Sequence, residues 1–573
     1  MDAEYHDQWA TRIAAGEWIG EEVFFRAPLY PYFLGAIYAL FGHDYYVARL
    51  IQLILGSVTC ILVYLIGRQI FNWKVGLIAS LIASSYGVLI YFDGELLITS
   101  LMTFVLLIAA LMLLHTAERP SGGKWFASGL LVGLTALARA NALILIPFVL
   151  LWLWWTFARH SRAFSKKLLF GWSALFVGGF LVVVLPVLVR NYCVGKDVVP
   201  IASQGGINFY IGNNPDSDGF TAIAPGTRPG WLEGYEDAIR IAEERAGGKL
   251  KPSQISDFWF SKGIDFITGE PGAYLRLLFK KLFLFWHGFE LSNNKEIYFF
   301  TRYSTFLRAI LWQSWLCFPF GLLSPLFFAG LFLAFKNLGV RKSAVTLASG
   351  IIGFYMVSVV AFFVCARFRV PIIPFLIAFA SYGLYWFFAQ IRARNHFGIL
   401  TFLSFTLLCG FLLNRGFFDV KKTNPALMHY TVGTVYQRKE RIEAAKREYV
   451  EALRTDPEFA KPYTNLGIIY SAEGDFEQAE QNFKKAISLD SSSEKAHFNL
   501  GTVYARNGEY LKAAEEYETA LQIIPDYEDA CYLAGLAYER LGMRERAIEK
   551  WEDCLRINPN SVRARRELQR MMN

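Results

Sequence analysis

Charged residues are scarce in this chain. Only 18% of its 573 residues are Asp, Glu, Lys or Arg, whereas 54% are hydrophobic and Phe alone occurs 50 times. A soluble protein of this length needs far more polar surface, so a fold fully surrounded by water is excluded for much of the chain. A basic stripe on a soluble domain is also lacking, which removes nucleic acid as an expected partner. The composition instead indicates an integral membrane protein.

Cysteine is also sparse. The chain has seven cysteines and no C-x-x-C pair, so it lacks the usual thiolate motifs for metal or redox chemistry. Cys531 and Cys554 fall at facing core positions of one helical hairpin. A disulfide between them stays open at this point, and two buried thiols are the preferred interpretation.

The sequence contains long apolar runs. Crossing a hydrocarbon core of ~30 Å takes about 20 helical residues, and ten runs reach or approach that length. They are 46–67, 75–92, 95–115, 125–138, 141–157, 168–189, 314–335, 343–366, 370–390 and 397–414. The sequence therefore predicts an all-α fold that begins with a polytopic membrane domain.

The charges between these runs predict the topology. Every alternate connection is basic, as with Arg68 and Lys74, and basic connections stay on the cytoplasmic side. Residues 1–25 carry six acidic residues and one Arg, which suits the outer side. Ten crossings then place the N-terminal segment, the 190–313 loop and the C-terminal part outside. Because a chain that starts outside without a preceding helix is uncommon, we expect a first transmembrane helix ahead of this sequence.

The positive net charge belongs to the apolar part of the chain. From Lys421 onward there are 23 Lys and Arg against 25 Asp and Glu, which leaves 34 against 24 of the totals of 57 and 49 for residues 1–420. Anionic membrane lipid is therefore the partner expected for this excess.

Several arginines break the topology rule, because they map to predicted outer ends of helices. They are Arg26, Arg139, Arg190, Arg367 and Arg369, and acids at comparable depth are Asp2, Glu4, Asp93 and Glu95. A guanidinium matches the geometry of a phosphate, and a carboxylate can take a proton from a hydroxyl. Together they suit a lipid-linked sugar phosphate. For each residue alone, pairing that anchors a helix end is an equally strong interpretation.

Four short stretches resemble a known family. DAEY (residues 2–5) followed by RAPLYP (26–31) resembles the first outer loop of GT-C glycosyltransferases, which include protein O-mannosyltransferases and aminoarabinose transferases. FDGE (92–95) is similar to their second acidic loop, and RFRVPIIP (367–374) to an R-[FY]-R-x-P-x-x-P element near the end of such membrane domains. The resemblance covers roughly residues 1–415.

The resemblance implies roles for these residues. Asp2 corresponds to the catalytic base and Arg26 to the residue that holds the polyprenyl phosphate, while Glu95 matches the second acidic loop better than Asp93. The candidate catalytic residues are therefore Asp2, Glu4, Asp93 and Glu95, and the candidate donor-phosphate ligands are Arg26, Arg139, Arg367 and Arg369.

The sequence departs from the family at one metal ligand. The aminoarabinose branch has a Glu before its basic residue, whereas Phe25 stands here. No metal ligand and no other cofactor is therefore assigned, although the resemblance leaves a divalent metal open. The acidic pair also differs, since Ala3 separates Asp2 from Glu4.

The long outer loop carries candidates for sugar or acceptor binding. The stretch 204–215 is rich in Gly and Asn, which predicts tight turns with positive φ, and it lacks the glycine pattern of nucleotide-binding loops. Aromatic rings beside amides can stack on a sugar and bind its hydroxyls. The candidates are Asn208, Tyr210, Glu290 and Asn294. An ordered lid that contacts no ligand is an equally strong interpretation.

A repeat of 34 residues is the most specific pattern in the chain. It is marked by Tyr436, Tyr470, Tyr504 and Tyr538 and by the glycines Gly433, Gly467, Gly501 and Gly535. This period is typical of tetratricopeptide repeats (TPR), helical hairpins that stack into a solenoid. We predict four repeats that capture a polypeptide segment; a spacer or dimerisation module is a serious alternative.

The complete division predicted is 1–45 for the first outer loop and juxtamembrane segment, 46–189 and 314–415 for the membrane halves, 190–313 for the outer loop region, 416–425 for a linker, 426–561 for the repeats and 562–573 for a capping helix. This combination resembles the TPR-containing transmembrane protein O-mannosyltransferases. It implies an enzyme of the bacterial inner membrane that moves a sugar from a polyprenyl-phosphate donor to a hydroxyl, with the repeats on the periplasmic side. Two alternatives stay open, an acceptor that is a glycolipid or envelope polysaccharide, and a non-catalytic membrane-anchored TPR scaffold.

Overall fold

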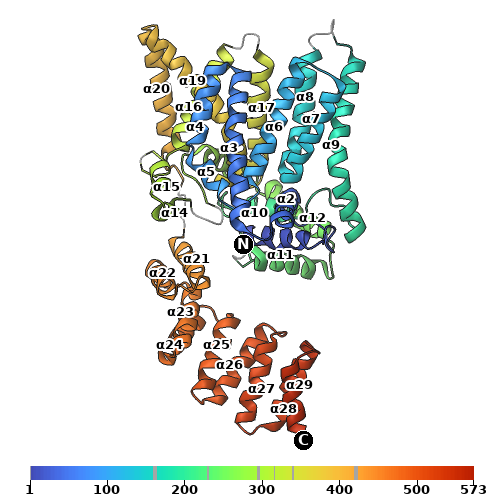
Figure 1. Ribbon diagram of the computed structural model, residues 1–573, viewed down its shortest axis with the longest axis vertical. Helices are drawn as coiled ribbons and strands as arrows, with labels where there is room; N and C mark the ends of the chain where they lie inside the picture. The colour runs from blue at the N-terminus through green and yellow to red at the C-terminus, as the bar shows by residue number, and fades with distance from the viewer. Residues whose placement is uncertain are drawn as a thin grey trace. The chain divides into compact units, whose positions relative to one another are not determined.

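The computed structural model describes residues 2–158, 164–228, 231–292, 297–314, 316–337, 341–418 and 424–572. Its regular elements in these ranges are helices, which confirms the predicted all-α class (Figure 1). The chain divides into two compact units, Met1–Val420 and Lys421–Asn573. The division falls inside the predicted linker.

The first unit begins with α1 (Asp2–Ala14) and α2 (Leu29–Phe41), and long apolar helices follow that run side by side (Figure 1). These are α3 (Tyr45–Ile70), α4 (Trp73–Ser84), α6 (Thr99–Glu118), α7 (Gly122–Ala138), α8 (Leu145–Phe157), α9 (Lys166–Gly195), α16 (Phe320–Lys336), α17 (Lys342–Val360), α19 (Ile373–Arg392) and α20 (His396–Asn414). Shorter pieces adjoin them, namely α5 (Gly87–Asp93), η1 (Ala140–Ile144), α18 (Ala366–Arg369) and η5 (Val370–Ile372).

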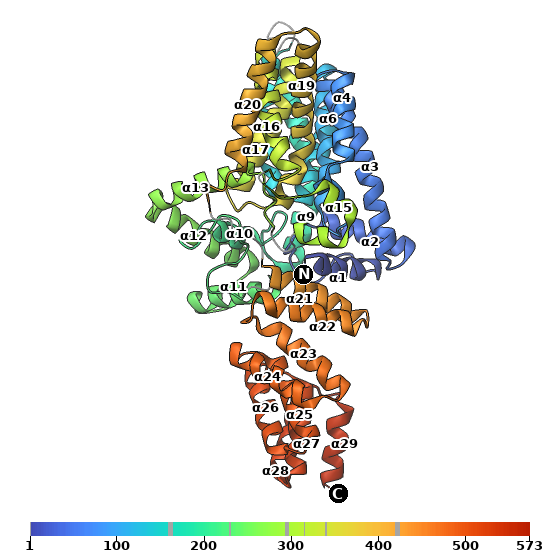
Figure 2. The ribbon, with the colours of Figure 1, turned by 90° about the vertical axis from the view of Figure 1, so that its left-hand side faces the viewer.

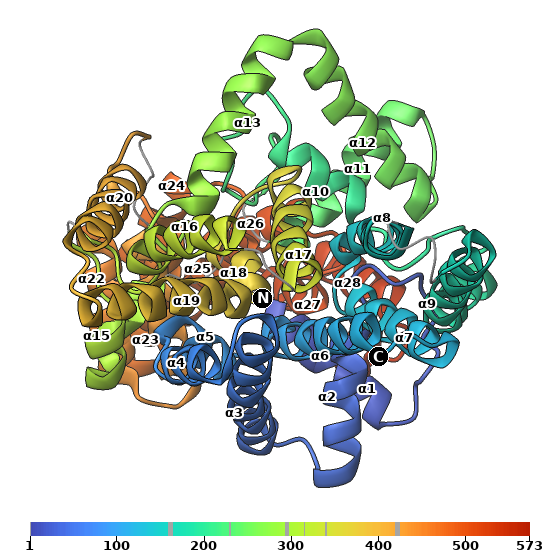
Figure 3. The same cartoon turned by 90° about the horizontal axis from the view of Figure 1, so that it is seen from above.

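All ten predicted runs fall on helices, but fewer are long enough to be spans by themselves. Seven helices among the described residues could cross a membrane by length and composition, and eight if α4 and α5, which meet at 59°, form one bent span. The two others, α7 and α16, have 17 residues each, or about 26 Å of helix. Both lie among the longer helices in Figure 3, and their crossing stays a prediction.

Small residues let these helices approach closely. Gly129 of α7 lies on the Phe176 carbonyl of α9, and Gly179 of α9 lies on the Phe126 carbonyl of α7, so a Cβ at either glycine would overlap backbone of the other helix. Apolar helices in lipid gain little from burying apolar surface, and close backbone packing is what holds them together. These glycines therefore fix the α7–α9 pair that carries Arg139 at its end.

The described residues of the basic connections lie together at one end of the unit, at the top of Figure 1. Arg341, before α17, donates to the Arg68 carbonyl at the end of α3 (3.2 Å), and Gln69 donates to Glu118 at the end of α6 (3.2 Å). Such contacts need these ends to be neighbours. The alternation of basic connections read from the sequence therefore corresponds to one face of the molecule.

The predicted outer segments gather at the opposite end. They form α10 (Gly205–Gly212), α11 (Trp231–Ala246), α12 (Pro252–Gly269), α13 (Pro271–Trp286), α14 (Ile297–Phe300), η3 (Thr301–Tyr303) and α15 (Thr305–Ile310). In Figure 2, α11 to α13 project sideways from the long helices. The end of α20 returns to this face, where the Gly288 amide donates to the Leu413 carbonyl (3.0 Å).

The second unit consists of helical hairpins, as the 34-residue period predicts. The helices are α21 (Pro425–Arg438), α22 (Ile442–Thr455), α23 (Ala460–Glu473), α24 (Phe476–Leu489), α25 (Glu494–Arg506), α26 (Tyr510–Ile523), α27 (Glu528–Arg540), α28 (Arg544–Ile557) and the terminal α29 (Val562–Met572). In each hairpin the repeat glycine faces the large ring of the second helix, as Gly535 faces Trp551. Both Cys531 and Cys554 are free and buried, as the preferred interpretation predicted.

Candidate functional site

A cavity of about 570 Å³ opens among the predicted outer segments of the first unit. Its wall combines residues from α1, from the loop before α2, from the α7–η1 junction, from α10 and from the segment between α17 and α18. Three of the four predicted phosphate ligands, Arg26, Arg139 and Arg367, line it together. They are separated by more than 300 residues of sequence, and only the fold brings them to one space.

Arg26 is positioned by a short segment without regular secondary structure that is hydrogen-bonded to the end of α9. The Phe24 amide donates to Asn191 of α9 (3.2 Å), and Ser203 and Gln204 donate their amides to the carbonyls of Phe24 and Phe25. The guanidinium carbon of Arg26 lies 5.2 Å from the centre of the Tyr5 ring of α1. The segment before α2 is thereby fixed against α1 and α9.

Arg139 and Arg367 both contact the Phe368 ring. Their guanidinium carbons lie 4.0 and 5.2 Å from its centre. Arg139 ends α7 in extended conformation, and the Tyr355 hydroxyl of α17 is hydrogen-bonded to it. The two like charges repel each other, and an anion suits them as a third partner.

The candidate Asn208 also lines the cavity, on α10. The predicted turns with positive φ are not found here, because residues 205–212 form a helix. The glycines serve close packing instead. A Cβ at Gly206 would overlap the Ser256 carbonyl of α12, and a Cβ at Gly212 would overlap the Phe362 carbonyl. Glycine at these positions holds α10 between α12 and the wall that carries Arg367.

Several polar lining residues were missed by the sequence analysis, among them His6 and Arg228. His6 of α1 is buried, and its ring packs edge-on against Tyr30 at 5.2 Å. Arg228 lines the cavity while its side chain bonds Asp237 of α11 (2.9 Å), and the hydrogen bonds from Arg228 lower the pKa of that carboxyl. The spacing of His6, four residues after Asp2, was a signal that could have found it.

Arg369 and Glu290 do not line the cavity. Arg369 is fully buried, its Nη2 bonds Glu290 at 2.6 Å, and its guanidinium also donates to the carbonyls of Phe285, His287 and Phe289. Burial raises the pKa of Glu290, and the neighbouring Arg369 opposes that rise. The pair ties the segment after α13 to α18, which is a structural arrangement.

The four candidate acids lie outside the wall of this cavity as far as the structure describes them. Glu4 is exposed, and Glu95 is half-buried with its carbonyl accepting from Gln52 (2.7 Å). Asp93 lines a separate cavity between α3 and α6. Asp2 begins α1, and its side chain is outside the described residues.

The other predicted residues are placed as follows. Tyr210 faces α12, where its ring lies 4.9 Å from that of Trp259. Asn294 is outside the described residues. Arg190 binds the carbonyls of Ile19 and Glu22 and lies over the Phe24 ring at 3.9 Å, so it supports the segment that carries Arg26.

The residues lining the arginine cavity suit an anion better than a cation. Its charged groups are arginines, and its other polar groups are amides, the hydroxyls of Thr227 and Ser358, the His6 ring and the Tyr235 phenol. Within the described ranges, no three His, Cys, Asp or Glu side chains converge on one point. We therefore assign no metal ligand and place no metal in a reaction step.

The fold and this cavity define a polytopic membrane protein joined to a TPR array. Residues 26–189 match the family model of the dolichyl-phosphate-mannose-protein mannosyltransferases, and three tetratricopeptide models match 426–459, 464–528 and 528–561. The suspected fusion is thereby confirmed at the level of these matches: residues 26–189 are similar to a mannosyltransferase family of the GT-C type, and TPR repeats follow in the C-terminal part. That family implies a lipid-linked sugar as donor, and the repeats suggest a peptide as partner.

No curated protein matches the chain. Among solved structures, similarity is found to MamA (28% identity, 24% of this chain and 82% of that chain, TM-score 0.24) and to MamA from Desulfovibrio magneticus RS-1 (24%, 26% and 84%, 0.25). It is also found to YrrB, a TPR protein with an unusual peptide-binding site (23%, 32% and 89%, 0.24).

Proposed function

We propose that the membrane unit transfers a sugar from a polyprenyl-phosphate carrier to a hydroxyl of a polypeptide that the repeats capture. The observation that supports this most is the meeting of Arg26, Arg139 and Arg367 around one cavity. Charge-assisted hydrogen bonds from guanidinium groups are the strongest that a protein offers a phosphate.

In this proposal the arginines stabilise the departing lipid phosphate. The acceptor oxygen attacks the anomeric carbon, the bond from that carbon to the phosphate oxygen breaks, and the hydroxyl proton passes to a carboxylate. Donors placed where negative charge develops lower the barrier of such a step. Asn208, on the same wall, is in position to bind sugar hydroxyls.

Asp2 is the carboxylate we assign as base. It stands four residues before His6 in α1, and His6 lines the cavity. Positions four apart share one face of a helix. The assignment thus follows from the helix register together with the family resemblance.

The face that carries the cavity is proposed to be the outer one. The basic connections lie at the opposite end, which is the arrangement of cytoplasmic loops. Because α20 ends on the cavity face, the chain enters the repeats from that side. We propose a multi-pass protein of the bacterial inner membrane with its TPR repeats in the periplasm.

Binding of radiolabelled polyprenyl-phosphate mannose and glucose to the purified full chain tests the proposal. We expect Arg26→Ala to lose binding, Asp2→Asn to bind without transferring label to a Ser- and Thr-containing peptide, and Arg415→Ala to behave as wild type. Arg415 is an exposed arginine on the same face and does not line the cavity. Equal binding by Arg26→Ala, or none by the wild type, would overturn the proposal; label in a lipid fraction instead of peptide would overturn the polypeptide acceptor.

A further inference from the structure

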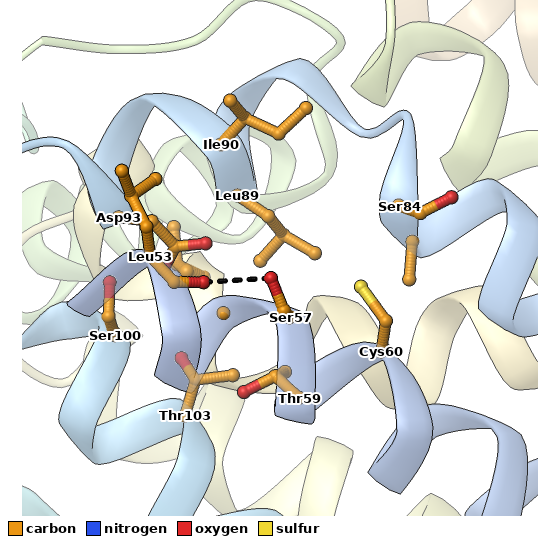
Figure 4. A pocket seen from close by; sticks show the side chains of 13 residues that line it. Leu53, Ser57, Thr59, Cys60, Ser84, Leu89, Ile90, Asp93, Ser100 and Thr103 are labelled. Carbon is orange, nitrogen blue, oxygen red and sulfur yellow. Dashed lines mark hydrogen bonds between the residues drawn. The ribbon is translucent and has the colours of Figure 1, made fainter. Parts of the chain in front are cut away.

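A second cavity, of about 270 Å³, lies between α3, α4, α5 and α6, apart from the arginine cavity. Figure 4 shows the oxygens of Asp93, Ser57, Thr59 and Thr103 around one space. The Asp93 carboxylate packs closely against α3, because a Cβ at Gly56 would overlap it. A carboxylate at this depth is rare and points to a function.

Four of the five hydroxyls that line this cavity have their donors occupied, and the fifth, that of Ser100, interacts with the Asp93 carboxylate. Ser57, Thr59, Ser84 and Thr103 each donate to a carbonyl of their own helix, at 2.8 to 2.9 Å. Hydroxyl oxygens whose donors are occupied can act toward a ligand only as hydrogen-bond acceptors. Together with the Asp93 carboxylate they present hydrogen-bond acceptors, and the lining holds no Lys, Arg or His among the described residues. The complement of such a wall is a cation that carries several hydrogen-bond donors.

The cavity opens toward the bilayer. Ser57, Ser84 and Leu53 of its lining are exposed, and the neighbouring surfaces of α3 and α4 carry exposed apolar residues such as Ile54 and Leu81. An occupant can therefore enter sideways from the membrane. A volume of 270 Å³ exceeds that of a bare ion and accommodates a small polar headgroup.

Arg49 supplies a charge of the opposite sign beside the cavity. It is exposed on α3, four residues before Leu53, and its Nε donates to the carbonyl of Gly94 (3.1 Å), the residue that follows Asp93. Positions four apart lie on one helix face. The site therefore offers an anion inside the cavity and a cation outside it.

We propose that this cavity binds the headgroup of an aminoethyl phospholipid, with the primary ammonium at Asp93 and the phosphate at Arg49. The three N–H donors of the ammonium match the acceptors of the wall, and the phosphate matches the guanidinium. A trimethylated headgroup lacks those donors, and an anionic headgroup without an amine meets the Asp93 charge. The site thus discriminates among the lipids of one leaflet by their headgroups.

Native mass spectrometry of the purified full chain, titrated with phosphatidylethanolamine, phosphatidylcholine and phosphatidylglycerol of the same acyl chains, tests this proposal. We expect phosphatidylethanolamine to bind at least tenfold more tightly than phosphatidylcholine. Asp93→Asn, which keeps the shape of the side chain, should abolish that preference. Ser57→Leu, which fills the cavity from its lipid edge, should abolish it too. Glu118→Gln changes an exposed carboxylate at the far end of α6 and should retain it.

Equal binding of the two lipids, or a preference that survives in folded Asp93→Asn, would overturn the proposal. Soluble phosphoethanolamine competing as well as the lipid would overturn the assignment to a membrane lipid. The readout is lipid binding, so it is independent of whether the protein transfers sugar.

Discussion

Arg139 and Arg367 share one aromatic ring: their guanidinium carbons lie 4.0 and 5.2 Å from the centre of Phe368. One arginine ends α7 and the other belongs to α18, so the contact joins the two halves of the membrane unit. Each cation gains from the ring face, and each raises the energy of the other. A phosphate between them would remove that cost, which makes the pair an anion site that is partly built before the ligand arrives.

Removing either arginine is expected to weaken donor binding without destabilising the fold. A charge-assisted hydrogen bond contributes about 1.5–3 kcal/mol, so Arg139→Gln and Arg367→Gln should each bind a polyprenyl-phosphate sugar roughly tenfold to a hundredfold more weakly. The loss of affinity in the double variant should be smaller than the product of the two single fold-losses, because both arginines bind one phosphate. Binding isotherms and thermal unfolding of the three variants check this; lower melting temperatures with unchanged binding would instead mark the arginines as structural.

Arg369 is expected to behave in the opposite way. Removing one member of a buried ion pair leaves the other charge uncompensated and costs about 3–5 kcal/mol. Arg369→Met and Glu290→Gln should therefore lower the melting temperature strongly, while the protein that stays folded binds donor as before. In Arg369→Met/Glu290→Gln the loss of stability should be smaller than the sum of the two single losses. Additive losses would show that Arg369 acts through the carbonyls it binds and not through Glu290.

The different surroundings of Arg367 and Arg369 could not be predicted from the sequence. Residues two apart in a helix point in different directions, so Arg367 and Arg369 share a motif but not a site. The 34-residue period and the ten apolar runs predicted helices correctly because each rests on many residues at once. The glycines of α10 were assigned to turns because their carbonyl neighbours on α12 and after α17 are distant in sequence. Asp93 was grouped with the arginines in one candidate site for the same reason, although the fold places it at a separate cavity.

The buried amine of Lys281 predicts a pH dependence of stability. Its Nζ donates to Asn213 (2.9 Å) and to the Phe362 carbonyl (2.8 Å), linking α13 to α10 and to the wall beside Arg367. Burial lowers its pKa from 10.5 to about 7. Between these values the unfolded chain binds more protons than the folded one, so stability should rise with pH from about 7 toward 10, by up to about 1.4 kcal/mol per unit.

Comparison of wild type with Lys281→Met isolates this contribution. Thermal unfolding from pH 6 to pH 9.5 should show a gap between the two proteins that widens in favour of the wild type above pH 7. Lys262→Met, at an exposed position of α12, should follow the wild-type profile. Parallel profiles for wild type and Lys281→Met would mean that the amine keeps its proton throughout.

In the repeats, Gly535→Ala is expected to destabilise the last hairpin. A Cβ there would overlap the indole of Trp551, and overpacking of this kind costs about 1–3 kcal/mol. Hydrogen exchange in α27 and α28 of the full chain should become faster. In a Trp551→Leu background the ring is gone, so adding Gly535→Ala should cause little further change; an unchanged effect would trace the cost to the backbone of α27 and not to the ring.

The proposed sidedness predicts that Cys193 reacts from outside the cell. It is exposed near the end of α9, on the cavity face, whereas the other six cysteines are buried or half-buried. A membrane-impermeant maleimide should label the wild type in intact bacterial cells and leave Cys193→Ser unlabelled. Labelling only after the membrane is opened would place this face in the cytoplasm, together with the arginine cavity and the start of the repeats. A periplasmic acceptor would then be excluded, while the phosphate-binding role of the arginines would still stand on their geometry.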